Sequence, residues 1–107
     1  MKSFKIMLSA SLVAMATVGA AQADKLTLYC SAQEDWCQLM ANNFQDATGI
    51  KVAMTRKSSG ETFAQIKAES SNPKGDVWWG GTGDPHLQAA EEGLTASYMS
   101  PMRDQLH

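Results

Sequence analysis

Three short segments rich in serine, threonine and glycine carry the polar groups best suited to hold a small ligand. Their hydroxyl and backbone N–H groups favour an anion such as a phosphate, a phosphonate or a carboxylate. Ser31 and Ser58 each precede a glutamate by three positions, the spacing of a capping box at a helix start, where unpaired N–H donors attract negative charge. The predicted ligand-binding residues are Ser31, Ser58, Ser59, Gly60, Trp79, Gly80, Gly81 and Thr82.

A purely structural role is the alternative for part of this set. Either serine can serve only to cap its helix, because capping boxes are common. Arg56 and Lys57 follow the second predicted strand, where they would add positive charge to the site or form a solvated strand end. Gly80 and Gly81 would allow close backbone approach to a ligand, or would only make a turn. Convergence of the three segments in space would favour the functional interpretation.

The elements that must position these segments alternate between strands and helices. Short β-favouring runs predict strands at 26–30, 50–55 and 76–79, and helix-start signals follow at Ser31, Ser58 and Asp84. This βαβαβα order predicts an α/β fold, a three-layer αβα arrangement around a parallel sheet. In such sheets ligands bind beyond the carboxyl ends of the strands, where the strand order reverses. The three polar segments, each of which follows a strand, should therefore meet at one edge.

Several apolar and aromatic residues receive a predicted place from this pattern. Trp78 and Trp79 are neighbours on a strand and point to opposite faces, so one should enter the core and the other should line the cleft. His86 follows the predicted Asp84-Pro85 helix start and is expected to be exposed. The first helix is predicted to end at Gly49 and to present an apolar face made of Trp36, Leu39, Met40, Phe44 and Ala47.

The first 23 residues predict export. Lys2 and Lys5 precede an uncharged, mostly apolar run at 6–18, and 21–23 reads Ala-Gln-Ala, a small-x-small cleavage site. We predict a signal peptide at 1–23, cleaved after Ala23, and a periplasmic mature chain at 24–107. A retained anchor is the alternative, but it needs about 20 apolar residues. Removing two lysines leaves seven basic residues against eleven acidic ones, a net charge of about −4 that gives no reason to expect nucleic acid as a partner.

Cys30 and Cys37 are the only cysteines of the chain. In an oxidising compartment a disulfide between them is predicted, and it would pin the first polar segment to the helix that follows. The alternative is a pair of buried free thiols. The spacing is not C-x-x-C, so it gives little support to a redox role, and neither histidine lies at a zinc-ligand spacing from the cysteines. We therefore expect no metal and no cofactor.

From Lys25 to about Leu94 the chain resembles the N-terminal lobe of extracellular solute-binding proteins of ABC transporters. The segments that carry this resemblance are Phe-Gln-Asp-Ala-Thr-Gly-Ile-Lys-Val at 44–52 and Asp-Val-Trp-Trp-Gly-Gly at 76–81. The resemblance is to ferric-iron receptors and to their relatives that bind hexose phosphates or aminoethylphosphonate. It implies a type II periplasmic-binding-protein fold whose two lobes close on a solute and deliver it to a permease in the inner membrane. Complete members are far longer, so 24–107 is expected to be an incomplete first lobe, and a monomer.

The resemblance also bears on the ligand. Some ferric receptors of the family use a histidine shortly after the first strand and a glutamate after the Asp-Val strand, where this chain has Gln33 and Gly80. Neither residue suits ferric iron. A sugar phosphate or organophosphonate is therefore the expected solute, with no catalysis, and ferric iron is the alternative. Two alternatives of another class are a small secreted enzyme that uses Cys30 or Cys37 with His86, and a non-functional fragment.

Overall fold

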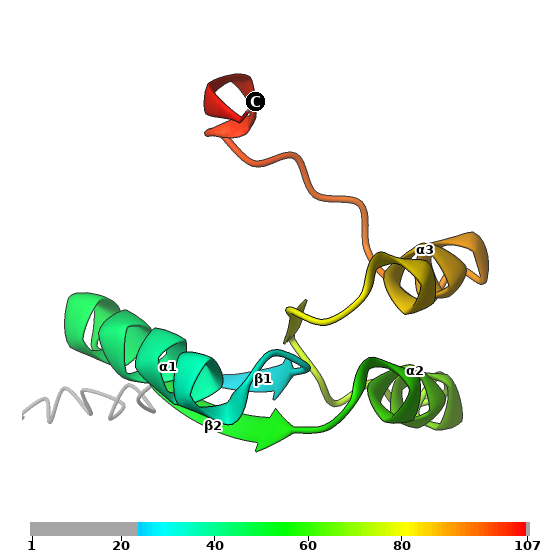
Figure 1. Cartoon of the computed structure of the whole chain (residues 1–107), viewed down its shortest axis with the longest axis horizontal. Coiled ribbons are helices and arrows are strands. Elements are labelled where there is room, and N and C mark those ends of the chain that lie inside the picture. Colours follow the sequence, from blue (N-terminus) through cyan, green and yellow to red (C-terminus); the bar gives the residue numbers. More distant parts are fainter. Residues whose placement is uncertain (1–23, 107) are drawn as a thin grey trace, which may run out of the picture.

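The computed structural model describes residues 24–106, and its helices and strands alternate along the chain (Figure 1). The predicted signal peptide lies outside the described residues. Within 24–106 no helix has both the length and the apolar character needed to cross a bilayer. The elements are β1 (Lys25–Cys30), α1 (Glu34–Thr48), β2 (Lys51–Arg56), α2 (Ser59–Ala68), β3 (Val77–Trp79), α3 (Gly83–Glu91) and the short 3-10 helix η1 (Arg103–Gln105).

The three strands form a parallel sheet in the order β2-β1-β3. The connection through α1 places β2 on one side of β1, and the connection through α2 returns past β1 to place β3 on the other side. Cys30 pairs with Arg56 on one side and with Trp79 on the other, so all three strands end level with one another. The strand order reverses at β1, and this edge is where an open α/β sheet binds ligands.

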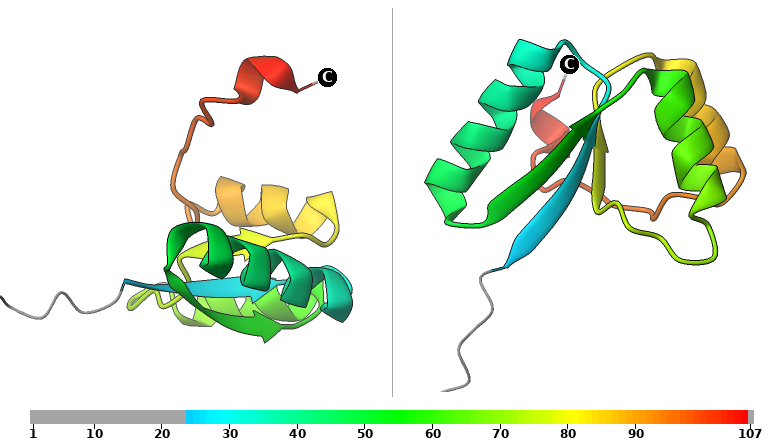
Figure 2. Two further views of the ribbon diagram at one scale, coloured as in Figure 1. Left: turned by 90° about the vertical axis from the view of Figure 1, so that its left-hand side faces the viewer. Right: turned by 90° about the horizontal axis from the view of Figure 1, so that it is seen from below.

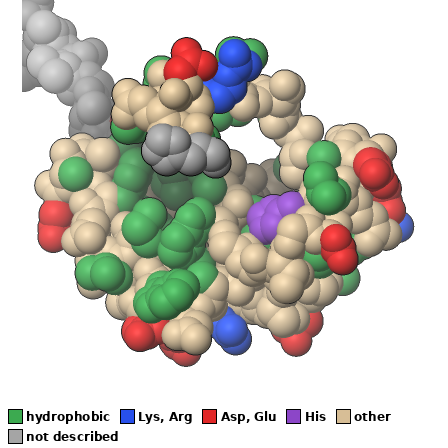
Figure 3. Space-filling view, turned by 45° about the horizontal axis from the view of Figure 1, so that its top comes forward, with side chains coloured by type: hydrophobic (Ala, Val, Ile, Leu, Met, Phe, Trp, Pro, Cys, Tyr) green, Lys and Arg blue, Asp and Glu red, His purple; other side chains and the backbone are tan. Residues whose placement is uncertain are grey.

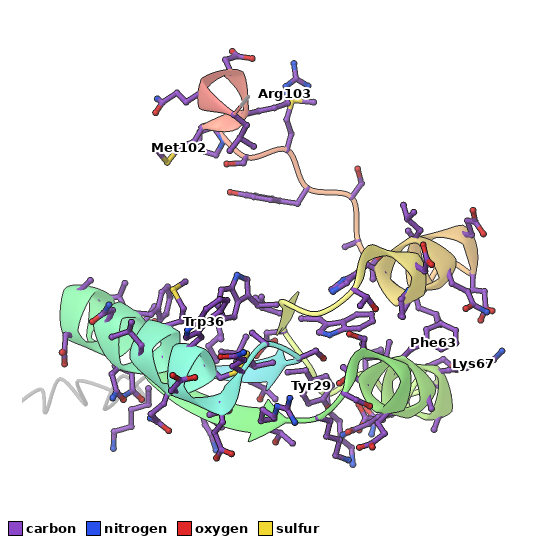
Figure 4. The ribbon with its side chains drawn as sticks, viewed as in Figure 1. Tyr29, Trp36, Phe63, Lys67, Met102 and Arg103 are labelled. Carbon is purple, nitrogen blue, oxygen red and sulfur yellow. A yellow bond between two sulfur atoms is a disulfide. The ribbon has the colours of Figure 1, made fainter. Side chains whose placement is uncertain are left out.

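Helices cover both faces of the sheet, which confirms the predicted α/β class and its three layers (Figure 2). Successive residues of a strand point to opposite faces. Leu28 and Cys30 of β1 therefore share a core with Cys37 and Ala41 of α1. Tyr29 points the other way, where its hydroxyl donates to Glu69 beside α2 at 2.7 Å (Figure 4).

Helices α2 and α3 lie side by side on the second face (Figure 1). Lys67 of α2 joins them, since its ammonium lies 3.2 Å from the Glu92 carboxylate at the end of α3. The same ammonium lies over the Phe63 ring, 5.8 Å from its centroid (Figure 4). The Lys67 side chain is 59% exposed, so solvent weakens both contacts and each stabilises this part of the fold only modestly.

The predicted apolar face of α1 was wrong for two of its bulkiest residues. Trp36 and Leu39 are 57% and 58% exposed, whereas Cys37 and Ala41 are the buried residues of the helix. Their small side chains let the helix backbone approach the sheet. Hydrophobic side chains are consequently left on the surface over α1 (Figure 3). An apolar groove there is lined by Leu26, Leu28, Met40, Ala41, Phe44, Val52, Val77 and Trp79.

Only one of the two serines predicted to cap a helix does so. The Ser58 hydroxyl accepts a hydrogen bond from the Glu61 N–H at 3.3 Å, which confirms the start of α2. Helix α1 begins later than predicted, at Glu34, with Gln33 as its N-cap and no side-chain cap. Ser31 therefore does not cap α1, because its hydroxyl is engaged elsewhere.

Two further helix boundaries depart little from prediction. Gly49 ends α1 as expected, and its N–H donates to the Gln45 carbonyl at 2.8 Å. Helix α3 begins one residue before the predicted cap Asp84, with Thr82 as its N-cap. Residues 94–106 then lead away from the layers to η1 (Figure 1). The three layers are thus built from 24–93.

We expect Glu69 to make the stability of the protein pH-dependent in acid. Hydrogen bonds from Gln65 and from Tyr29 lower the pKa of Glu69 from its usual 4.5. A lowered pKa stabilises the fold above pH 4.5, and this contribution disappears as the pH falls through the lowered value. Glu69→Gln should therefore be less stable than wild type at neutral pH, with the difference vanishing in acid. Urea unfolding at pH 7 and at pH 3 measures this, with Glu91→Gln, an exposed glutamate on α3, as control.

Candidate functional site

The three polar segments that follow the strands meet at one edge of the sheet, as the topology predicts. The N–H of Ser31 donates to the Trp79 carbonyl at 2.9 Å, and the N–H of Lys57 donates to the Cys30 carbonyl at 3.1 Å. The Thr82 N–H donates to the Ser59 hydroxyl oxygen at 2.9 Å, which ties the glycine turn to the start of α2. Every pair of segments is thus joined by a hydrogen bond or by direct packing.

The glycine turn after β3 packs against both other segments. Gly80 and Gly81 have φ angles of +79° and +93°, a region that residues with a side chain rarely adopt. A Cβ atom on Gly80 would lie 2.8 Å from the Ala32 Cβ, and one on Gly81 would collide with the Ser59 hydroxyl and lie 2.8 Å from the Ser31 Cβ. Only glycine therefore allows this close approach.

Ser31 is buried, with 8% of its surface exposed. Its hydroxyl accepts a hydrogen bond from the Trp78 indole N–H at 2.9 Å and pairs with the Thr62 hydroxyl at 3.1 Å. These contacts join the segment after β1 to α2 and β3 at one atom. The structure thus gives Ser31 a connecting role, which sequence reasoning missed because the partners lie 31 and 47 residues away.

The first turn of α2 supplies a second set of hydrogen-bond donors at this edge. Ser58 and Gly60 are exposed and Ser59 is half-buried. The Ser59 oxygen accepts from Thr82, which holds the side chain in place and leaves the hydroxyl hydrogen available to a ligand. The N–H groups of the first turn of a helix have no partner within the helix, and the helix dipole makes this end positive.

Arg56 is fixed at the rim of the same edge. Its Nε–H donates to the Ala32 carbonyl at 3.0 Å, although the residue as a whole is exposed. The guanidinium therefore has a preferred position rather than moving freely at the end of β2. It brings a permanent positive charge to the first polar segment.

The predicted disulfide between Cys30 and Cys37 is present, with an S–S distance of 2.08 Å. Both residues are fully buried, and they join the end of β1 to the second turn of α1. The bridge closes the loop that carries Ser31 and Ala32, so it holds this wall of the site in place. Neither cysteine presents the thiolate that a secreted thiol enzyme would require.

The two neighbouring tryptophans point to opposite faces, as predicted. Trp79 packs against the core on the α1 side and lines the apolar groove. Trp78 lies on the other face, stacked on the His86 ring with centroids 3.7 Å apart and an interplanar angle of 23°. The expectation of an exposed His86 was wrong, because the ring is half-buried and its Nε2–H donates to the Gly80 carbonyl at 2.8 Å.

Within 24–106, no three His, Cys, Asp or Glu residues gather closely enough to bind a metal ion. Gln33 is the exposed N-cap of α1. At Gly80 the backbone is too close to Ala32 for any side chain in this conformation. The groups at this edge include serine hydroxyls, backbone N–H groups and the Arg56 guanidinium, a donor set that suits an anion.

Comparison with known proteins places the chain in a family. The model of the bacterial extracellular solute-binding protein family matches residues 26–106. An uncharacterized protein of Haemophilus influenzae is 41% identical over 111 residues, an alignment that covers 99% of this chain and 32% of that protein. The chain thus spans about a third of the length of this relative.

The solved structures of three periplasmic binding proteins are similar to the structure of this chain. AfuA from Actinobacillus pleuropneumoniae, with fructose-6-phosphate bound, is 45% identical with a TM-score of 0.77, over 78% of this chain and 26% of AfuA. P5PA is 38% identical with a TM-score of 0.73, over 76% and 26% of the two chains. Iron-bound HitA from Pseudomonas aeruginosa is 28% identical with a TM-score of 0.68, over 73% and 25%. The chain belongs to the bacterial extracellular solute-binding protein family and has the fold of the first part of a type II periplasmic binding protein.

Proposed function

We propose that the three segments at the carboxyl edge of the sheet form one wall of a binding site for a phosphorylated small molecule, such as a sugar phosphate or an organophosphonate. The observation that carries the proposal is the close approach of Gly81 to both Ser31 and Ser59, which leaves no room for a Cβ atom and brings the three loops together. The chain covers about a quarter of the solved relatives, so other parts of such a protein would supply further contacts.

The charge and the donors at this edge support a phosphate group. The Ser59 hydroxyl and the start of α2 offer hydrogen-bond donors, apart from the Glu61 N–H that Ser58 caps, and the positive end of the helix dipole lies beside them. The Arg56 guanidinium is held next to Ala32 and offers further N–H donors in a planar fork, which matches phosphate oxygens. Of the predicted ligand residues, Ser59 and Gly60 have the geometry that best fits this role.

The similar solved structures suggest two classes of ligand, a phosphorylated sugar and iron, and the residues at this edge of the sheet favour the first. AfuA, whose structure contains fructose-6-phosphate, is more similar to this chain than iron-bound HitA is. Ferric iron prefers carboxylate, phenolate or imidazole ligands. This edge instead presents Gln33, a glycine turn and serine hydroxyls. We therefore place ferric iron second.

The proposed role is that of the solute-binding component of an ABC importer. The exported, periplasmic location that the sequence predicts at 1–23 would place the protein where a solute can be captured and passed to a permease in the inner membrane. Binding without catalysis requires no nucleophile, which agrees with the two cysteines being joined. Delivery of the solute to the permease also requires that the solute bind reversibly.

Titration of the purified protein with fructose 6-phosphate, inorganic phosphate, fructose and ferric citrate tests the proposal. We expect saturable binding of the two phosphates with a Kd on the order of millimolar, because one wall supplies few contacts. Fructose alone should not bind. Ser59→Ala should weaken phosphate binding about fivefold, the effect of losing one hydrogen bond.

The matched control is Ser71→Ala, which changes an exposed serine beyond the end of α2 and should leave the affinity unchanged. Equal binding of fructose and fructose 6-phosphate would contradict a phosphate site. Binding of ferric iron without phosphate binding would support the second candidate instead.

A further inference from the structure

We infer that His86 and Trp78 are positioning residues that hold the Gly80–Gly81 turn against Ser31. The inference rests on the proposed function in one respect, namely that the turn is part of the ligand site. Neither side chain is among the ligand-binding residues predicted from the sequence. His86 contacts Gly80 and Trp78 contacts Ser31, so both side chains reach the edge at which the three segments meet.

His86 fixes the turn through its carbonyl oxygen. Its Nε2 lies 2.8 Å from the Gly80 oxygen, and because a carbonyl can only accept, the ring must carry hydrogen on Nε2. His86 belongs to α3, so this bond ties the turn to the helix that follows it. The turn also packs closely against Ala32, Ser31 and Ser59, and the bond from His86 adds a fixed position for its carbonyl oxygen.

Trp78 connects this histidine to the first polar segment. The His86 and Trp78 rings stack at 3.7 Å between centroids, and the Trp78 indole N–H donates to the Ser31 hydroxyl at 2.9 Å. The Ser31 hydroxyl in turn pairs with Thr62 inside α2. A continuous series of contacts therefore connects the turn, through the two stacked rings, with the segment after β1 and with α2.

The contacts of His86 and Trp78 also influence the residue proposed to bind the ligand. The Thr82 N–H donates to Ser59, the residue proposed to face the phosphate, so the direction of the turn also sets the direction of the Ser59 hydroxyl. If the two rings are altered, Ser59 keeps its place in α2 but loses the partner that orients its side chain. The rings thus act on the ligand through Ser59 and do not touch it themselves.

Three variants separate the three contacts of the pair, which are the bond to Gly80, the ring stack and the bond to Ser31. His86→Phe keeps a stacked ring and removes the N–H donor, whereas His86→Gln keeps a donor and removes the ring. Trp78→Phe keeps the stack and removes the bond to Ser31. Leu87→Ala, which changes an exposed neighbour on α3, is the matched control.

Amide hydrogen exchange followed by NMR reports on the turn without any ligand. We expect the Thr82 amide to exchange about fivefold faster in His86→Phe, with partial restoration in His86→Gln, since one hydrogen bond is lost and regained. The Ser31 amide should exchange faster in Trp78→Phe. The Cys37 amide, bonded to the Gln33 carbonyl in α1, should not change and shows that the fold is intact.

Affinity for fructose 6-phosphate should fall about fivefold in His86→Phe and remain at the wild-type value in Leu87→Ala. Unchanged Thr82 exchange in His86→Phe, together with unchanged Ser31 exchange in Trp78→Phe, would overturn the inference whether or not any ligand binds. Faster exchange with unchanged affinity would overturn its link to binding. If wild type binds none of the phosphates, the proposed function fails, and the exchange rates still decide whether the rings hold the turn.

Discussion

Replacing Cys30 and Cys37 together by alanine is expected to lower the free energy of unfolding by about 2.5 kcal/mol, the loop-closure estimate for so short a bridged segment. For a chain of this size the melting temperature should fall by roughly 10 to 20 °C. Both sulfur atoms lie in the core shared by β1 and α1, so the loss also loosens the packing of α1. Urea unfolding and thermal melting measure the effect.

Chemical reduction provides the control for this prediction. A reductant should destabilise wild type by a similar amount and should leave the double alanine variant unchanged. The bridge also closes the loop that carries Ser31, so reduction should weaken phosphate binding in wild type. Identical unfolding curves for wild type with and without reductant would show that the disulfide does not stabilise the fold.

Gly81→Ala is expected to destabilise the protein by about 2 to 6 kcal/mol and to abolish detectable phosphate binding. Strain at a φ of +93° costs about 1 to 3 kcal/mol for a residue with a side chain, and forced overpacking costs a similar amount. The new Cβ would displace the Ser59 hydroxyl and press on Ser31. The three segments would then be forced apart.

Gly83→Ala is the matched control for this variant. Gly83 lies two residues further along, at the start of α3, and a Cβ there would meet no atom within 4 Å. It should keep both the stability and the affinity of wild type, or gain slightly from the better helix propensity of alanine. Equal loss in the two variants would mean that the close approach of Gly81 to the other loops does not matter.

Local patterns predicted the elements and the meeting of the three segments well. The short β-favouring runs and the Ser58 helix cap depend on residues that are neighbours in sequence, so the structure contains them as predicted. The rule that parallel strands end at a common edge then placed 31–32, 58–60 and 80–82 together. Local patterns did not predict which side chains form hydrogen bonds or stack with one another between elements.

Ser31 and His86 show why the rest was missed. A capping-box pattern at Ser31 competed with hydrogen bonds to Thr62 and Trp78, and the distant partners prevailed because the buried hydroxyl needs them. His86 looked like an ordinary first-turn residue, since its contact with the Trp78 ring depends on how α3 packs. Both misses concern contacts between elements.

The rotation of α1 could have been predicted more closely from the sequence itself. A disulfide from Cys30 to Cys37 requires Cys37 to face the sheet, and Ala41 and Phe44 follow it at helical spacing. Bulk alone favoured a face centred on Trp36 and Leu39, which are exposed instead. A covalent constraint outweighs the size of apolar side chains when the two disagree.

The most direct test of the proposed site is to follow the titration with fructose 6-phosphate residue by residue, by NMR of backbone amides. We predict shifts concentrated at 31–33, 58–61 and 80–83, with a common Kd on the order of millimolar. Inorganic phosphate should reproduce the pattern, and fructose should not. Shifts confined to the apolar groove over α1, or the absence of any saturable shift, would contradict the conclusion that these three segments bind a phosphorylated solute.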